Sequence, residues 1–259
     1  MHHALEPDPA RGVFSTMLVI DGQPVELDPH LAQLRESVRA LYAAQLPSQA
    51  EELVLDAARG CALGRVRLSA RADASGAVQL EALARPIERA IVLPDDALDL
   101  RTAPVENWHG AHKWVDRRLL DALEAATAPA SALLVERDGR VLETTRANVF
   151  ALGRDGVLRT PPADGSILPG VTRAHAIAIA RERGAAVQEA PLTPDALRAA
   201  REVFATGSIR GVEPVRSLDG APLGERGREG RGELASAIAD ALRHRWLERV
   251  AAHARAGGM

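Results

Sequence analysis

The sequence has 259 residues, of which 46% are hydrophobic and 26% are charged, and its formal net charge is −3. This composition supports one large core or two smaller ones, and no apolar run approaches the roughly 20 residues of a membrane span. The arginines are scattered among acidic residues, so a nucleic-acid partner is not expected. The single cysteine, Cys61, excludes an internal disulfide and favours a reducing, cytoplasmic setting. No metal is predicted, because the eight histidines show no ligand spacing such as HExxH.

The first hundred residues are predicted to form an α+β unit with an antiparallel sheet. A β-rich run is followed by a DGQP turn and an amphipathic helix, with Asp28 as its expected N-cap and Pro29 at its first helical position. A second helix is predicted over 48–60, where Gly60 ends it. The predicted strands are 13–20, 64–73 and 77–87.

The rest of the chain is predicted to alternate helices with a meander of strands. A connector over 101–112 leads into a helix over 114–127, and DGR and GRDG turns then separate strands within 131–162. The later predicted elements are a helix from Pro169–Gly170 to Gly184, a short helix with Thr193 as N-cap, a strand–turn–strand pattern over 202–215, a Gly- and Arg-rich loop over 219–232 and a final helix over 233–253. The predicted domains are a small lobe at 1–107 and a larger lobe at 108–259.

Lys113, in the segment HKWVDRRLLD, is the only lysine of the chain, since the other 31 of the 32 Lys and Arg residues are arginines. An arginine cannot be deprotonated in a protein, whereas a partly buried lysine can, and its neutral amine can condense with a carbonyl. The alternative is chance in an arginine-rich sequence. The position of Lys113 next to the predicted lobe boundary, where ligand sites are common, favours amine chemistry.

Two segments are suited to holding a phosphate group. ILPGVTRAHAIAIA places free backbone N–H groups of Val171 and Thr172 at the start of a helix, where they attract anions. EVFATGSIRG places the hydroxyls of Thr206 and Ser208 beside Gly207, which lets the backbone approach a ligand closely. Each segment alone is also consistent with an ordinary helix start or a tight turn.

A carboxylate and an amide follow in the predicted meander. Glu143 in LETTRANVF lies five residues before Asn148, one of only two asparagines in the chain. A carboxylate that faces a pyridine nitrogen keeps that nitrogen protonated and makes the ring an electron sink. The alternative for Glu143 is an exposed acid in a turn.

The order of these motifs resembles a known family. It comprises H-x-x-x-L on an early helix, a lone Lys before D-R, E-x4-N, LPGVTR, and E-x-F-x-T-G-S followed by PV. From residue 12 to about residue 220 the chain is similar to the class IV, fold type IV, pyridoxal-phosphate enzymes. That family contains branched-chain and D-amino-acid aminotransferases and 4-amino-4-deoxychorismate lyase. The variants VFSTMLV, HKWVDRRLLD and VLETTRANVF are most similar to the lyase branch.

The resemblance implies an α+β fold with a small N-terminal lobe, a larger C-terminal lobe that holds a pseudo-barrel of strands, and a pyridoxal 5′-phosphate site between the lobes of a homodimer. Lys113 would be the Schiff-base lysine, and Glu143 would pair with the pyridine nitrogen. Arg117, Arg146 and His109, together with Arg101, are candidates for binding substrate carboxylates. The other cofactor-binding residues that the resemblance implies are Asn148, Val171, Thr172, Thr206, Ser208 and Gln33.

Gln33 departs from the family pattern. The family usually has H-x-x-R-L, whose arginine binds the cofactor phosphate, and this chain has His30-Leu31-Ala32-Gln33-Leu34. An amide offers donors but no charge, which could weaken phosphate binding by about 1.5–3 kcal/mol. Either the cofactor is held more loosely, or another arginine, such as Arg67 or Arg146, replaces the missing charge, or the protein no longer uses the cofactor. The retained Lys113 argues against the last alternative.

The resemblance implies an enzyme that converts 4-amino-4-deoxychorismate to 4-aminobenzoate, a folate precursor, and pyruvate. A functional partner would then be aminodeoxychorismate synthase. A class IV aminotransferase acting on branched-chain or D-amino acids is the alternative, since both reactions use the same lysine. A non-enzymatic descendant that binds a partner or a ligand without chemistry is a third hypothesis, and Gln33 is its only support in the sequence.

Overall fold

The computed structural model describes residues 6–224 and 232–256. These residues divide into two compact units. The barrel unit contains 93–111, 117–224 and 232–242 with residue 6, and the small unit contains 7–92, 112–116 and 243–256. The units differ from the predicted lobes at 1–107 and 108–259, because the chain passes between them several times near the expected boundary. In the described part of the chain, no helix has both the length and the apolar character to cross a membrane.

The small unit is built on an antiparallel sheet with the strand order β2-β1-β3-β4. The predicted strands 13–20, 64–73 and 77–87 are found here with ends shifted by a residue or so. The elements are η1 (Pro9–Arg11), β1 (Val13–Ile20), β2 (Gln23–Pro24), α1 (Leu27–Tyr42), α2 (Ala50–Ala58), β3 (Leu63–Ala72), β4 (Val78–Pro86) and η2 (Arg89–Ile91).

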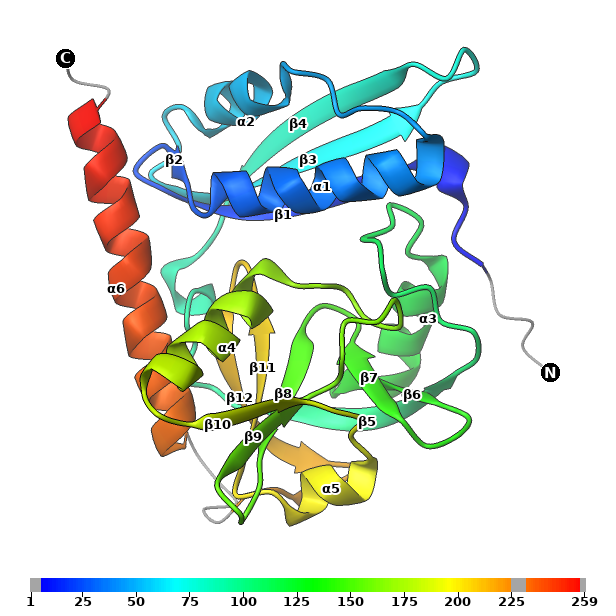
Figure 1. The fold of residues 1–259 in the computed structure, drawn as a ribbon, viewed down its shortest axis with the longest axis vertical. Helices are drawn as coiled ribbons and strands as arrows, with labels where there is room; N and C mark the ends of the chain where they lie inside the picture. The colour runs from blue at the N-terminus through cyan, green and yellow to red at the C-terminus, as the bar shows by residue number, and fades with distance from the viewer. Residues whose placement is uncertain (1–5, 225–231, 257–259) are drawn as a thin grey trace. The chain divides into compact units, whose positions relative to one another are not determined.

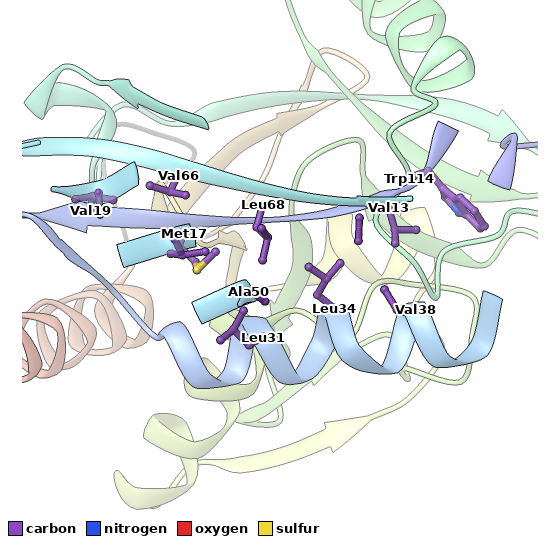
Figure 2. Close-up of a cluster of buried hydrophobic side chains, with 13 residues drawn as sticks. Val13, Met17, Val19, Leu31, Leu34, Val38, Ala50, Val66, Leu68 and Trp114 are labelled. Atoms are coloured by element: carbon purple, nitrogen blue, oxygen red, sulfur yellow. The ribbon is translucent and has the colours of Figure 1, made fainter. Parts of the chain in front are cut away.

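The core of the small unit lies between the sheet and its two helices (Figure 2). Strand β3 alternates, so that Val66 and Leu68 are fully buried on the helix side while Arg65 is exposed on the other. Helix α1 contributes Leu31 and Leu34 from one face. Burying each of these side chains stabilises the fold by roughly 1.5–3 kcal/mol. The alternation in the strand and the helical period in α1 therefore decide which face of each element turns toward the core.

Two helices begin at other residues than predicted. Helix α1 begins at Leu27, after Glu26 in a left-handed conformation, so that Asp28 lies inside the first turn and is not the N-cap. The helix predicted over 114–127 begins only at Arg118, as α3 (Arg118–Thr127). The physical reason is that the residues before it are extended and pair with β1, which removes them from the helix.

The barrel unit contains a closed ring of six strands in the order β8-β11-β12-β5-β6-β7, with β7 pairing back to β8 (Figure 1). The pairs β5–β6 and β5–β12 are parallel, and the other pairs of the ring are antiparallel. The strands of this unit are β5 (Leu98–Val105), β6 (Ser131–Glu136), β7 (Val141–Thr144), β8 (Asn148–Leu152), β9 (Val157–Thr160), β10 (Ala186–Glu189), β11 (Glu202–Gly207), β12 (Gly211–Leu218) and β13 (Ala221–Pro222).

The other helices of this part of the chain follow the predictions more closely. They are α4 (Val171–Glu182), α5 (Pro194–Ala199) and the long α6 (Glu233–Ala256), and the residues of α6 are shared by the two units. Thr193 caps α5 as predicted, and its hydroxyl accepts the Ala196 N–H at 3.1 Å. The predicted loop over 219–232 contains β13, and residues 225–231 of it lie outside the described residues.

The two faces of β8 and β11 have different surroundings. Val149 and Val203 join an apolar cluster with residues from β5, β6, β7 and β12, which places them inside the ring. Phe150 and Phe204 point the other way and stack with their ring centroids 5.0 Å apart. Because side chains alternate along a strand, Asn148 and the other residues in phase with the phenylalanines also lie outside the ring.

Candidate active site

Lys113 is presented by an extended segment that adds to the free edge of β1. The Phe14 N–H donates to the Lys113 carbonyl at 2.8 Å, and the Val115 N–H donates to the Gly12 carbonyl at 3.0 Å. Between these bonds Trp114 forms an antiparallel bridge with β1. The backbone on both sides of the lysine is therefore fixed by strand pairing.

Strand alternation then decides where the lysine side chain goes. Trp114, only 7% exposed, enters the core of the small unit (Figure 2). Its ring meets that of His112 edge-on, with the ring centroids 5.5 Å apart. Lys113 points to the opposite side, where its Nζ lies 5.2 Å from the centroid of the Phe14 ring. The Cζ atom of Arg67 lies 3.7 Å from the same centroid. Two cationic side chains therefore share one aromatic ring.

A buried carboxylate fixes the chain just after the lysine. Asp116 is 6% exposed and accepts hydrogen bonds from the Asp8 backbone N–H at 3.1 Å and from Arg11 at 3.4 Å. These bonds join the residues of η1 to the lysine segment. Lys113 is thus held from both sides, which is the rigidity expected of a reactive amine.

The barrel unit holds Glu143 and Asn148 as neighbours. They are direct partners across β7 and β8, and the Asn148 amide donates to Glu143 Oε2 at 3.1 Å. The same amide donates to the Leu168 carbonyl at 2.9 Å, while the Leu168 N–H donates to the two carboxylate oxygens at 3.3 and 3.2 Å. The indole of Trp108 is a further donor, 3.4 Å from Oε1. Glu143, 7% exposed, is therefore not an exposed turn acid but a carboxylate surrounded by donors.

The start of α4 is the predicted anion site. Gly170 is its N-cap and makes no side-chain capping bond, and the first intrahelical bond runs from the Ala174 N–H to the Gly170 carbonyl. The N–H groups of Val171 and Thr172 precede that bond, so the helix itself supplies no acceptor for them. A side chain at Gly170 would not fit, because its Cβ would lie 2.2 Å from Asn148 Oδ1.

Thr206 completes this arrangement. It is the register partner of Asn148 across β8 and β11, and it is 2% exposed. Within the described residues its hydroxyl oxygen has no hydrogen-bond partner. Leaving a buried hydroxyl unsatisfied costs about 1–3 kcal/mol, so the position is suited to a ligand oxygen. Beside an uncapped helix start, this hydroxyl fits a phosphate group.

The structure brings five of the predicted residues together within the barrel unit. They are Glu143, Asn148, Val171, Thr172 and Thr206. Ser208 follows in the half-buried turn after β11. Lys113 and Gln33 belong to the small unit, where Gln33 is half-buried on α1.

Two of the three arginines predicted to bind substrate carboxylates, Arg117 and Arg146, are engaged at the turn between β7 and β8, whereas Arg101 is exposed on β5. Arg146 makes two bonds of 2.7 Å to Glu124, which also accepts the Thr145 hydroxyl at 2.5 Å. Arg117 donates to the Thr145 carbonyl at 3.2 Å. The bond from Arg146, aided by that from Thr145, holds the pKa of Glu124 below its usual 4.5. His109 is exposed in the loop that precedes Lys113. The two arginines thus stabilise the turn that joins Glu143 to Asn148.

Sequence reasoning did not identify Trp108, Trp114 or Leu168 as site residues. The two tryptophans flank Lys113 in WHGAHKW, and this spacing of aromatic residues around the lone lysine was the available signal. Leu168 acts through its backbone, which no residue type reveals. Among the residues with described positions, no group of three or more His, Cys, Asp or Glu side chains could hold a metal ion.

The sequence is similar to known proteins along most of its length. A family model described as amino-transferase class IV matches residues 12–218. The branched-chain-amino-acid aminotransferase of Escherichia coli (strain K12) is 42% identical over 93 residues, and the match covers 36% of this chain and only 30% of that protein. The D-alanine aminotransferase of Bacillus licheniformis is 29% identical over 233 residues, which is 82% of this chain and 81% of that protein.

Solved structures share the fold along nearly the whole chain. A proposed 4-amino-4-deoxychorismate lyase from Legionella pneumophila has a TM-score of 0.79 at 23% identity, covering 95% of this chain and 96% of that one. A hypothetical aminotransferase from Mycobacterium tuberculosis in its PLP-bound form has a TM-score of 0.78 at 22% identity, covering 96% and 95%. At these identities the likeness is one of fold.

Proposed function

The chain belongs to the class IV aminotransferase family of pyridoxal-phosphate enzymes, and from this premise we propose that it is a lyase that converts 4-amino-4-deoxychorismate to 4-aminobenzoate and pyruvate. The family, the fold type and the cofactor, pyridoxal 5′-phosphate, were predicted correctly from the motifs. The substrate and the type of reaction are the proposal.

The observation that carries the covalent cofactor chemistry, which the lyase and the aminotransferase share, is the fixed presentation of the only lysine. Lys113 is half-buried and pinned by β1 on both sides, beside Phe14 and Arg67. No other residue of this chain offers an amine that can be neutral near pH 7, apart from the N-terminus. We therefore assign to Lys113 the covalent attachment of the cofactor.

The remaining roles follow from the chemistry of each group. When bound, pyridoxal phosphate supplies an aldehyde for amine exchange and a ring that accepts electrons. Thr206 and the N–H groups of Val171 and Thr172 would hold its phosphate, and Glu143 would keep its ring nitrogen protonated. Their arrangement supports these assignments, since all four lie in one unit and the Thr206 hydroxyl has no partner within the described residues.

Lys113 would also act as the base. Its amine, when it is neutral and not attached to the cofactor, would remove the proton from the substrate carbon that carries nitrogen. Protonation of the enolpyruvyl methylene then releases pyruvate, and the carbocycle becomes aromatic. Atoms balance without water or a second substrate, and aromatisation makes the reaction effectively irreversible.

Arg67 is our candidate for the charge that Gln33 does not supply. Arg146, the other candidate, is held by two bonds to Glu124. Arg67 instead stacks on the Phe14 ring that Lys113 also approaches, so its Cζ lies no more than 8.9 Å from Lys113 Nζ, the sum of the two distances to the ring centroid. A ligand attached to Lys113 is therefore within reach of this guanidinium, which can meet a phosphate or a substrate carboxylate.

The lyase is preferred over the aminotransferase because VFSTMLV, HKWVDRRLLD and VLETTRANVF are most similar to the lyase branch. The aminotransferase is the second candidate, because the curated relatives are named branched-chain-amino-acid and D-alanine aminotransferases. The two reactions differ in their need for an acceptor. A lyase requires no keto acid, whereas an aminotransferase must receive one to complete its second half-reaction.

A coupled assay separates the candidates. Purified protein loaded with pyridoxal phosphate is given aminodeoxychorismate without any keto acid, and pyruvate is followed with lactate dehydrogenase. Pyruvate in amounts well above one equivalent supports the lyase. Glutamate formation from 2-oxoglutarate and a branched-chain or D-amino acid, together with no release of pyruvate from aminodeoxychorismate, supports the aminotransferase.

Substitution of the lysine tests the attachment. Lys113→Ala should abolish the visible absorption band of the attached cofactor, while Lys113→Arg, which keeps the charge, should abolish it equally. A band that persists in both variants would show that the assignment of Lys113 is wrong.

A further inference from the structure

We propose that Trp108 is a positioning residue for Glu143, whose indole N–H holds the carboxylate ionised and in a single orientation. The inference rests on the proposed function, because an ionised Glu143 is useful only if it keeps a ring nitrogen protonated. Neither the family motifs nor the arguments from sequence assign a role to Trp108.

The tryptophan is fixed in a loop of the barrel unit that ends before Lys113. Its backbone N–H donates to Glu136 Oε1 at 3.3 Å, and its side chain packs on a buried cluster that includes Val105 and Leu120. From this base its Nε1 reaches Glu143 Oε1 at 3.4 Å. The indole is therefore held by apolar packing and a backbone bond, independently of its contact with the carboxylate.

The neighbouring glycine locks this loop against another. A side chain at Gly110 would place its Cβ 2.3 Å from the Ser166 carbonyl oxygen, so the loop of Trp108 lies directly against Ser166 and Ile167. Leu168, in that second loop, gives its N–H to the same carboxylate. Two loops pressed together thus direct donors at Glu143 from separate parts of the chain.

The donors are divided between the two carboxylate oxygens. Asn148 binds Oε2 and Trp108 binds Oε1, while the Leu168 N–H is shared. Trp108 is thus a side-chain donor at Oε1, and loss of its N–H would remove one of the bonds that this oxygen accepts.

The chemical type of the donor matters. An indole N–H can only donate, so it stabilises a carboxylate that accepts and gains nothing from a carboxylic acid that presents its own proton at the same oxygen. An amide such as Asn148 can turn over and accept instead. Trp108 therefore favours one protonation state of Glu143, the ionised one, as a ring-nitrogen partner requires.

The contact itself is tested in the cofactor-free protein, where the proposed function plays no part. The indole N–H resonance of Trp108 is identified by its loss in Trp108→Phe, with those of Trp114 and Trp246 as internal references. Glu143→Gln should shift the Trp108 resonance upfield, because a charged acceptor has been replaced by a neutral one. An unchanged resonance overturns the proposal, whatever reaction the protein catalyses.

The consequence is tested with the loaded protein, using cofactor labelled with ¹⁵N in its ring. Trp108→Phe should move the ring-nitrogen resonance toward the unprotonated value and lower the rate of substrate deprotonation roughly two- to tenfold, the worth of one such hydrogen bond. In a Glu143→Gln background the same substitution should have no further effect on either quantity. An equal loss in both backgrounds would show that Trp108 acts by packing alone and would refute the positioning role.

Discussion

Thr206→Val should change the stability of the protein and its cofactor affinity in opposite directions. The substitution replaces a hydroxyl by a methyl group of similar size at a position that is 2% exposed. Within the described residues the hydroxyl oxygen has no hydrogen-bond partner, so the cofactor-free protein loses no bond and no longer buries an unsatisfied polar atom.

The expected changes in stability and in affinity follow from the cofactor-free and the cofactor-bound states, respectively. Relief of an unsatisfied buried hydroxyl is worth about 1–3 kcal/mol, which for a chain of this size raises the melting temperature by roughly 2–4 °C per kcal/mol. A hydrogen bond to a charged phosphate contributes about 1.5–3 kcal/mol, so the affinity for pyridoxal phosphate should fall at least tenfold. The affinity for pyridoxal, which lacks the phosphate, should stay nearly the same.

Thr160 offers a matched control. It is fully buried, and its hydroxyl donates to the Val149 carbonyl at 2.8 Å. Thr160→Val should therefore destabilise the cofactor-free protein, by about 1–3 kcal/mol, because it leaves a buried carbonyl without its partner. The stabilities of the two variants are measured by thermal unfolding without cofactor. Their affinities for pyridoxal phosphate are measured by titration followed at the visible band.

Two results would refute the reasoning. If Thr206→Val destabilises the cofactor-free protein as much as Thr160→Val does, the Thr206 hydroxyl has a partner in the absence of the cofactor. If the preference for pyridoxal phosphate over pyridoxal is unchanged in Thr206→Val, the hydroxyl does not bind phosphate.

Three further substitutions test other parts of the site. Trp114→Ala should lower the free energy of unfolding by about 3–5 kcal/mol in urea titrations, because it empties part of the small unit's core. Trp114→Phe should lower it clearly less, and equal losses of stability in the two variants would contradict this packing role. Gly170→Ala should weaken pyridoxal phosphate binding at least tenfold in titrations, because the new Cβ would lie 2.2 Å from Asn148 Oδ1; unchanged affinity would place the phosphate elsewhere. The bond from Arg146 holds the pKa of Glu124 below 4.5, so its stabilising effect is present above that pH and is lost as the pH falls through the lowered value. Glu124→Gln should therefore lower the free energy of unfolding near pH 7 by less than about 1 kcal/mol for this half-exposed pair, and it should melt at a lower temperature than wild type. The difference in melting temperature should vanish in acid, and a difference independent of pH would contradict this role of Glu124.

Local patterns in the sequence were enough to predict much of the fold. The run GRVRLSARAD predicted the strand β3, whose Val66 and Leu68 the structure buries on one face. Thr193 followed by Pro194 predicted the start of α5, because a threonine side chain can satisfy a free N–H of the first turn. These features depend on residues a few positions apart, so they can be seen without the rest of the chain.

The sequence also singled out Lys113, but it misplaced the element that carries it. The segment after it has the composition of a helix, and the predicted helix therefore began at Trp114. In the structure the edge of β1, about a hundred residues earlier, pairs with this segment, and the core buries Trp114. Non-local hydrogen bonds and burial of a large aromatic side chain outweighed local helix propensity, as tertiary context often does.

The sequence by itself determined the chemical groups of the site: one lysine, one candidate carboxylate, a helix start and two small hydroxyls. Only the tertiary structure decided which of them meet and in what state. Closure of the barrel makes Thr206, Asn148 and Glu143 neighbours on three adjacent strands, and it leaves the Thr206 hydroxyl without a partner among the described residues. Register and closure depend on pairings between distant strands, such as β5 with β12, whose energies no local window of sequence contains.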